Sequence, residues 1–289
     1  MTTERNKLTV YLALISTILM WSSAFAGIRI GMREFGPGSF ALLRLGIAAI
    51  CMLFIYQVKA PKTKLQRKEI VEAILLGVIG MGLYHTFLNL GEKTVPAGLA
   101  SFVVSQVPIV TTLVGFLFLK EKLNRRVFLG LVLGCLGTLI IAFGDLKNTN
   151  YDLGVVYIMA SVCASCFYVI RAQHLLKRMS VLQASSFMIF GGAISSLIFL
   201  PQLIRQIQYA SQEVILAGLY LGIFPTSLAT LTQNYAIARV SRTTAVSCYY
   251  AIPLITSFIA WLWLKEVPTL VPFLGGLISL VGAVLMNFK

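Results

Sequence analysis

Long apolar runs alternate along this chain with short polar connections. Ten runs can be marked, at residues 8–32, 38–58, 69–91, 95–119, 126–144, 153–173, 180–204, 212–235, 240–264 and 269–288. A helix of about 20 apolar residues is long enough to cross the hydrocarbon core of a bilayer. The most polar connection, residues 145–152, divides the pattern into two sets of five runs. The pattern predicts an all-α integral membrane protein with ten transmembrane helices.

The second set of runs repeats the first. Residues 89–143 align without a gap with residues 234–288, and 14 of the 55 aligned pairs are identical. The identical pairs include Pro108/Pro253, Lys120-Glu121/Lys265-Glu266, Gly130/Gly275 and Gly137/Gly282. Two-fold internal repeats in membrane proteins are typical of transporters. We therefore expect residues 1–146 and 147–289 to be two five-helix repeats within one membrane domain.

Five spans per repeat predict that the two repeats have opposite orientations in the membrane. With the N-terminus inside, 17 of the 24 Lys and Arg residues lie at the inner face, and six lie at the outer face. Cytoplasmic loops carry such an excess of basic residues. The chain is therefore predicted to be a multi-pass membrane protein with both termini cytoplasmic.

Composition narrows the classes of function. The chain has 289 residues, of which 58% are hydrophobic and 12% charged, whereas soluble domains carry about a quarter charged residues. The net charge of +14 comes from short loops and not from a compact basic module, so no nucleic-acid partner is expected. An HExxH motif and a glycine-flanked serine motif are both missing from the sequence, so we expect no enzyme, no metal and no cofactor.

Polar and aromatic residues near the middle of the runs are the candidates for a substrate site, because unpartnered polar groups in lipid cost several kcal/mol. They gather in runs 1, 3 and 4 and again in runs 6, 8 and 9, which suggests a central cavity. The predicted substrate-binding residues are Trp21, Ser22, Tyr84, His85, Asn89, Gln106, Tyr168, Tyr249 and Tyr250. His85 could contact substrate or handle a proton. The alternative is a neutral histidine tied to a neighbouring helix.

Other mid-run residues have competing interpretations. Pro108 and Pro253 each remove a backbone donor and predict a kink, as a paired hinge or as a structural bend. Arg44 is close enough to a span end to extend toward the interface, where we favour a structural role over the binding of an anionic group. Small residues spaced four apart, such as Gly130 and Gly275, predict packing of the fifth run against the tenth, or dimerisation.

Several short motifs carry a family resemblance over essentially the whole chain. They are Trp21-Ser22-Ser23-Ala24-Phe25, Leu43-Arg44-Leu45, Pro108 with Leu119-Lys120-Glu121, and Pro253 with Leu264-Lys265-Glu266. Together they resemble the drug/metabolite transporter superfamily, and within it the ten-helix metabolite exporters of EamA type. The resemblance implies an inner-membrane exporter of amino acids, their analogues or other small metabolites, with a cavity lined by helices 1, 3, 4, 6, 8 and 9. Trp21, Ser22, Pro108 and Pro253 match its motifs.

We therefore expect an exporter of small metabolites, amino acids or related compounds, that works by alternating access through a central cavity. Its partners would be a small-molecule substrate and the lipid bilayer, with the chain a monomer or a weak homo-oligomer.

One alternative is a proton-coupled exporter of drugs or organic cations, which needs a carboxylate in the cavity. No Asp or Glu lies deep in any run, so facilitated movement or exchange is favoured. The other alternative is a membrane scaffold without transport.

Overall fold

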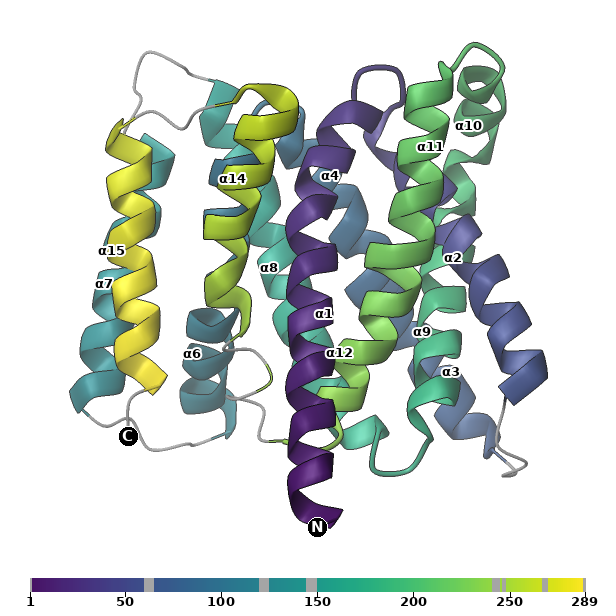
Figure 1. The fold of residues 1–289 in the computed structure, drawn as a ribbon, viewed down its shortest axis with the longest axis horizontal. Coiled ribbons are helices and arrows are strands. Elements are labelled where there is room, and N and C mark those ends of the chain that lie inside the picture. The colour runs from purple at the N-terminus through teal and green to yellow at the C-terminus, as the bar shows by residue number, and fades with distance from the viewer. Residues whose placement is uncertain are drawn as a thin grey trace.

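The protein is a bundle of helices that stand side by side (Figure 1). The computed structural model describes residues 2–59, 65–119, 125–143, 150–240, 245, 248–266 and 270–287. Within these ranges the chain forms helices and turns, and no strand occurs. The first residues of the first helix and the last residues of the final helix lie at the same edge of the bundle (Figure 1).

Several spans are divided into shorter helical elements. The first half contains α1 (Thr2–Gly31), α2 (Pro37–Lys59), α3 (Arg67–Gly77), η1 (Val78–Leu83), α4 (Tyr84–Glu92), α5 (Ala97–Val104), α6 (Val107–Leu119) and α7 (Arg125–Phe143). The second half contains α8 (Asn150–Leu175), α9 (Val181–Ser196), η2 (Leu197–Phe199), α10 (Leu200–Ile207), α11 (Gln212–Leu221), η3 (Gly222–Leu228), α12 (Ala229–Ile237), η4 (Cys248–Ala251), α14 (Ile252–Leu264) and α15 (Leu270–Asn287).

Seven helical stretches are long and apolar enough to cross a membrane. They are Leu8–Gly31, Pro37–Lys59, Arg67–Glu92, Ala97–Leu117, Leu153–Leu175, Val181–Ile207 and Gln212–Ile237. Two shorter apolar helices follow at Tyr249–Leu264 and Phe273–Gly282. Large apolar side chains also cover the outside of the bundle, as with Phe54 and Ile198, which are 65% and 76% exposed. Such a surface suits lipid and not water, so the chain is a multi-pass membrane protein.

The element boundaries repeat along the chain with the spacing seen in the sequence. Helix α14 begins and ends 145 residues after α6, and α12 begins and ends 145 residues after α4. The π-helical turns η1 and η3 occupy matching places in the third and seventh of the long apolar helices. The boundary expected between residues 146 and 147 and the Lys120-Glu121 motif lie outside the described residues.

Proline explains the two breaks that precede α6 and α14. The ring of a proline clashes with the carbonyl group four residues earlier in a helix, and proline lacks the backbone N–H that would donate to that carbonyl. That carbonyl belongs to Val104 for Pro108, and α5 ends at Val104. For Pro253 the corresponding residue is Tyr249, which lies in the 3-10 turn η4 before α14. Both helices thus restart directly before their proline.

The glycine-rich faces of α7 and α15 pack against each other, which confirms the packing interpretation of these residues. The two helices lie side by side at one end of the bundle (Figure 1). A Cβ atom on Gly137 would stand 2.4 Å from the carbonyl oxygen of Gly275, and one on Gly282 would stand 2.6 Å from that of Gly130. Ser279 Oγ donates to the Gly134 carbonyl at 3.1 Å. Only residues without bulky side chains permit this approach.

Candidate functional site

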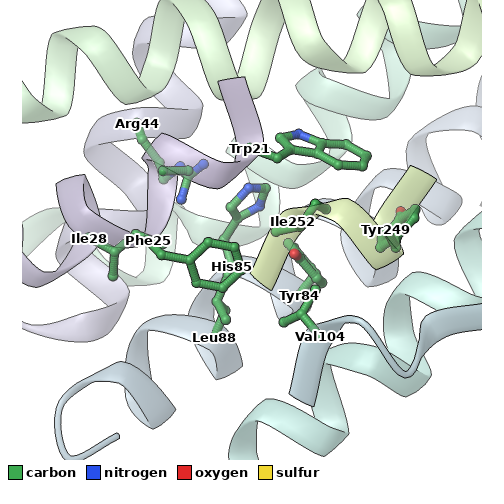
Figure 2. A pocket seen from close by; sticks show the side chains of 11 residues that line it. Trp21, Phe25, Ile28, Arg44, Tyr84, His85, Leu88, Val104, Tyr249 and Ile252 are labelled. Carbon is green, nitrogen blue, oxygen red and sulfur yellow. The ribbon is translucent and has the colours of Figure 1, made fainter. Parts of the chain in front are cut away.

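A small cavity lies inside the bundle, where α1, α2, α4, α5 and the start of α14 meet. Figure 2 shows the side chains around it. Its wall is formed by Trp21, Ala24, Phe25, Ile28, Arg44, Tyr84, His85, Leu88, Val104, Tyr249 and Ile252. Four of the nine predicted substrate-binding residues are therefore brought together here, although they come from three separate spans of the sequence. They are Trp21, Tyr84, His85 and Tyr249.

Trp21 is held in the cavity wall by the π-helical turn η3. Its indole Nε1–H donates to the carbonyl oxygen of Pro225 at 3.0 Å. Pro225 lies inside this turn and has no N–H of its own, so the local backbone departs from the regular helical pattern. The ring of Trp21 lies 5.3 Å from that of Tyr249, at an interplanar angle of 58°. Two aromatic faces from opposite ends of the chain thus form one side of the cavity.

His85 is fixed by its own helix. Its Nδ1 lies 2.7 Å from the carbonyl oxygen of Met81, in the π-helical turn η1. Because a carbonyl oxygen only accepts, Nδ1 carries the hydrogen of this bond. The Tyr84 ring stands edge-on to the imidazole, with the ring centroids 5.0 Å apart. The alternative of a histidine tied to a neighbouring helix does not describe this contact, which is local.

Arg44 also lines the cavity, although its place in the sequence favoured a structural role over the binding of an anionic group. Its side chain does not extend to the interface; the residue is 2% exposed and points at the space beside His85 (Figure 2). The guanidinium Nε donates to Thr226 Oγ1 at 3.1 Å, and the Thr226 hydroxyl donates to the Leu221 carbonyl at 2.7 Å. A rule that treats any ionisable residue within a span as functional would have selected it.

Three other predicted binding residues lie outside the cavity wall and donate hydrogen bonds to backbone carbonyl groups. Ser22 Oγ lies 3.5 Å from the carbonyl oxygen of Ile252. Asn89 Nδ2 donates to the Pro37 carbonyl at 2.9 Å, which ties α4 to the start of α2. Gln106 Nε2 donates to the Phe102 carbonyl at 3.0 Å, across the break that precedes Pro108. The amide nitrogens of Asn89 and Gln106 thus donate to backbone carbonyl groups, whereas their buried amide oxygens have no hydrogen-bond partner among the described residues.

Tyr168 and Tyr250, the two remaining predicted residues, also lie outside the wall. Tyr250 is half-buried and packs against the apolar core. The Tyr168 hydroxyl donates to Asn234 Oδ1 at 2.9 Å, and Asn234 Nδ2 donates to Ser185 Oγ at 2.9 Å. All three side chains of this network are buried, and they join α8, α12 and α9. No side chain of α8 or α12 reaches the cavity wall, unlike the arrangement that the resemblance implied for helices 6 and 8.

The Tyr168→Phe variant tests whether this network is structural. Loss of the hydroxyl leaves the buried Asn234 Oδ1 without its donor, which costs roughly 1–3 kcal/mol. We expect a lower melting temperature of the purified protein with transport per folded molecule retained. The Tyr157→Phe variant is a matched control, since Tyr157 lies on the same helix with 36% exposure. A selective loss of transport at unchanged stability would instead support the substrate contact predicted for Tyr168.

A charged cluster stands at the edge of the bundle beyond the cavity, where α1, α4 and α14 end. Arg29 Nε lies 2.9 Å from Glu266 Oε1, and Arg29 Nη1 donates to the Glu92 carbonyl oxygen at 2.6 Å. Glu266 Oε2 accepts from the backbone N–H of Ala97 at 3.0 Å. The cluster therefore connects α1, the end of α4, the start of α5 and the end of α14.

Glu92 is a buried carboxyl group at the end of its span, and not in the middle of it. The third apolar run was expected to end at residue 91, but α4 includes Glu92 and buries it completely. Neither carboxyl oxygen has a hydrogen-bond partner among the described residues. A single turn of helix thus separates this carboxyl group from Leu88 in the cavity wall.

The cavity is too small for a metabolite in this conformation. The volume of the cavity is about 30 Å³. A single water molecule already needs roughly 10–15 Å³ of such space. The described residues contain no group of three or more His, Cys, Asp or Glu side chains placed to hold a metal ion.

Comparisons with known proteins agree with this architecture. The family model of the EamA-like transporter family matches residues 8–143 and again residues 152–288. The uncharacterized transporter YdfC of Bacillus subtilis (strain 168) is 34% identical over 290 residues, which covers 98% of this chain and 93% of the relative. A crystal structure that is 20% identical has the same fold, with a TM-score of 0.67 over 96% of both chains.

Two further relatives have more specific names. The "Probable terminal-alkyne amino-acid exporter" of Streptantibioticus cattleyicolor is 27% identical over 278 residues, covering 95% of this chain and 92% of the relative. The uncharacterized inner membrane transporter YedA of Escherichia coli (strain K12) is 23% identical over 252 residues, covering 87% and 81%. With two family matches that together span nearly its whole length, the chain belongs to the EamA-like transporter family, as a multi-pass membrane transporter.

Proposed function

We propose that this transporter exports small metabolites, amino acids or related compounds, by alternating access through the cavity between α1, α2, α4, α5 and α14. The observation that carries the proposal is the composition of the cavity wall. Aromatic and aliphatic side chains form most of it, with a few placed polar groups from His85, Arg44 and Tyr84. Binding sites for small organic molecules have this mixture of surfaces. A relative named for amino-acid export adds support for the substrate class.

The proposed transport cycle uses ten spans arranged as two inverted repeats. Matching element boundaries 145 residues apart support the repeats, and the position of both chain ends at one edge of the bundle supports an even number of spans (Figure 1). The excess of Lys and Arg at the predicted inner face supports a cytoplasmic location for that edge. A relative named as an inner membrane transporter supports the same location. We propose that the chain works as a monomer or a weak homo-oligomer.

The helix breaks before Pro108 and Pro253 are the proposed hinges. At each break the proline removes one backbone hydrogen bond between the two half-helices, which lowers the cost of tilting one against the other. Ile252, at the start of α14, lines the cavity, as does Val104 at the end of α5. Movement at either break would therefore change the volume of the cavity directly.

A second candidate is proton-coupled export of organic cations, and the buried Glu92 is the observation in its favour. Its carboxyl group is titratable and lies one helical turn from Leu88 in the cavity wall. The positive charge of Arg44 in the cavity wall argues against this candidate, because it repels a cationic substrate. Transport of a labelled amino acid and a labelled organic cation, each with and without an imposed pH gradient, separates the two candidates.

The His85→Ala variant tests the proposed site. In inside-out membrane vesicles we expect uptake of labelled amino acids to fall by at least about tenfold, as for the loss of a placed polar contact in a binding pocket. Expression and melting temperature are expected to stay near those of the wild-type protein, since the Nδ1 contact is local to α4.

His174 supplies the matched control. Its Nδ1 makes the same local contact, with the Ile170 carbonyl at 3.0 Å, but the residue is absent from the cavity wall. The His174→Ala variant should keep wild-type uptake. Equal uptake by the two variants would remove His85 from the proposed site.

A further inference from the structure

The guanidinium of Arg44 has unused binding capacity inside the cavity. The residue is 2% exposed, and its Nη1 has no hydrogen-bond partner among the described residues. Its one hydrogen bond to a side chain goes from Nε to the neutral hydroxyl of Thr226. A buried cation without a directly bonded counter-charge is costly, and the cost is recovered when an anionic group binds it. Arg44 therefore marks a place for a negative group at the cavity wall.

His85 offers the complementary capacity. Its Nδ1–H is committed to the Met81 carbonyl, so in the neutral imidazole Nε2 is a hydrogen-bond acceptor. No partner for Nε2 occurs among the described residues. Figure 2 shows the imidazole and the guanidinium of Arg44 facing the same space from α4 and α2. One donor group and one acceptor group thus adjoin each other in a wall formed mostly by aromatic and aliphatic side chains.

We propose that Arg44 and His85 together recognise the zwitterionic α-carbon group of an amino acid, with the carboxylate on the Arg44 guanidinium and the ammonium group on His85 Nε2. This inference rests on the proposed function, because it assigns the substrate class of the same cavity. The side chain of the amino acid then lies against the aromatic surfaces of Trp21 and Tyr249. These surfaces select the size and apolar character of the substrate side chain, whereas Arg44 and His85 bind the carboxylate and ammonium groups that all amino acids share.

The same geometry disfavours other ligands at this place. A phosphate ester carries about two negative charges, and the described residues of the cavity wall supply one guanidinium to meet them. A sodium ion would need several oxygen ligands, and the guanidinium of Arg44 in the same wall would repel it. A single carboxylate with a nearby ammonium group matches what the wall offers.

The inference is tested by isothermal titration calorimetry of the full-length protein in lipid nanodiscs. The probes are L-phenylalanine and L-leucine, their primary amides, and the deaminated acids 3-phenylpropanoate and 4-methylpentanoate. For the wild-type protein we expect each amide and each deaminated acid to bind about 10- to 100-fold more weakly than its amino acid, as for loss of a charge-assisted hydrogen bond. The Arg44→Gln variant should lose the preference of amino acid over amide, and His85→Phe the preference over the deaminated acid.

Thr226→Val is the matched control for a purely structural role of Arg44. It removes the hydroxyl that accepts from Nε and leaves the guanidinium in place. If Arg44 only braces the π-helical turn η3, Arg44→Gln and Thr226→Val will weaken all six probes by similar factors. The proposal requires instead that Thr226→Val keeps the ratio of amino acid to amide.

The outcomes separate this inference from the proposed function. If the wild-type protein binds amino acids but Arg44→Gln keeps the preference over the amides, the inference is wrong and the proposed function stands. If the wild-type protein binds amides as tightly as amino acids, the recognition of the zwitterion is also wrong. If none of the six probes binds the wild-type protein, both the inference and the proposed amino-acid substrates are rejected.

Discussion

The Gly77→Ala variant is expected to lose much of the stability of the bundle. A Cβ atom at this position would stand 1.9 Å from the carbonyl oxygen of Met188, in the backbone of α9. The contact is reciprocal, because a Cβ on Gly191 of α9 would stand 2.1 Å from the Ile74 carbonyl oxygen of α3. Backbone cannot move aside as a side chain can, so the two helices must separate. Overpacking of this kind costs roughly 1–3 kcal/mol, and more for larger residues.

The measurement is the melting temperature and the yield of monodisperse protein after purification. Gly46→Ala is the matched control, since a Cβ at Gly46 meets nothing within 4 Å. Alanine also favours a helix over glycine by about 1 kcal/mol, so this control should melt at or above the wild-type temperature. Equal melting temperatures for the two variants would show that α3 and α9 are not packed backbone to backbone.

The Glu266→Ala variant is expected to open the end of the bundle beyond the cavity. It removes the partner of Arg29 and the acceptor for the Ala97 N–H at the start of α5. The Arg29 and Glu266 side chains are 28% and 22% exposed, so solvent screens the ion pair less than at a free surface. With two buried or half-buried partners left unsatisfied, the closed state loses roughly 1–3 kcal/mol. The population of the open state should then rise about tenfold or more.

Labelling of a cysteine placed at Leu88, in a protein without its native cysteines, measures this opening. A membrane-impermeant maleimide added outside the cell should react at least about tenfold faster with the Glu266→Ala variant. Glu213→Ala is the control, because its ion pair with Arg33 is 3.3 Å long and joins side chains that are 53% and 63% exposed. Such a pair contributes little. An unchanged labelling rate in Glu266→Ala would show that the cluster does not close this end.

Lys265 explains how Glu266 reaches this cluster. It ends α14 in the left-handed conformation, with φ 57°, and is the only described residue other than glycine with a positive φ. The turn it makes directs Glu266 back toward α1 and α5. The Lys-Glu motif is visible in the sequence, but the partner of the carboxylate, Arg29, lies 237 residues earlier in the chain.

The spans were largely predictable because bilayer thickness imposes a length on each apolar run. The eighth run was expected at residues 212–235, and the structure has a continuous helical stretch at Gln212–Ile237. The internal repeat was equally visible, since duplicated packing keeps its glycines and prolines. The predicted end of the third run, residue 91, was one residue short of Glu92. Hydropathy ends an apolar run before a charged residue, whereas the structure includes Glu92 in the helix and buries its side chain.

The site was less predictable because polar residues inside spans have two uses that look alike in sequence. Tyr168 and Asn89 satisfy partners on neighbouring helices, whereas Tyr84 and His85 face the cavity. All four are polar or amphipathic residues near the middle of an apolar run. Arg44 was predicted to extend toward the membrane interface. Its side chain instead turns inward, where Nε donates a hydrogen bond to Thr226 Oγ1 on η3.

The sequence by itself determined the helical membrane class, the approximate spans, the two-fold repeat and the transporter family. Each of these depends on local hydropathy, on spacing or on motifs within one stretch of chain. The tertiary structure alone decided which polar side chains line the cavity, that Arg44 is among them, and that Arg29 meets Glu266 beyond it. These outcomes depend on how the helices are rotated about their axes and on partners more than 100 residues away, which no local pattern encodes.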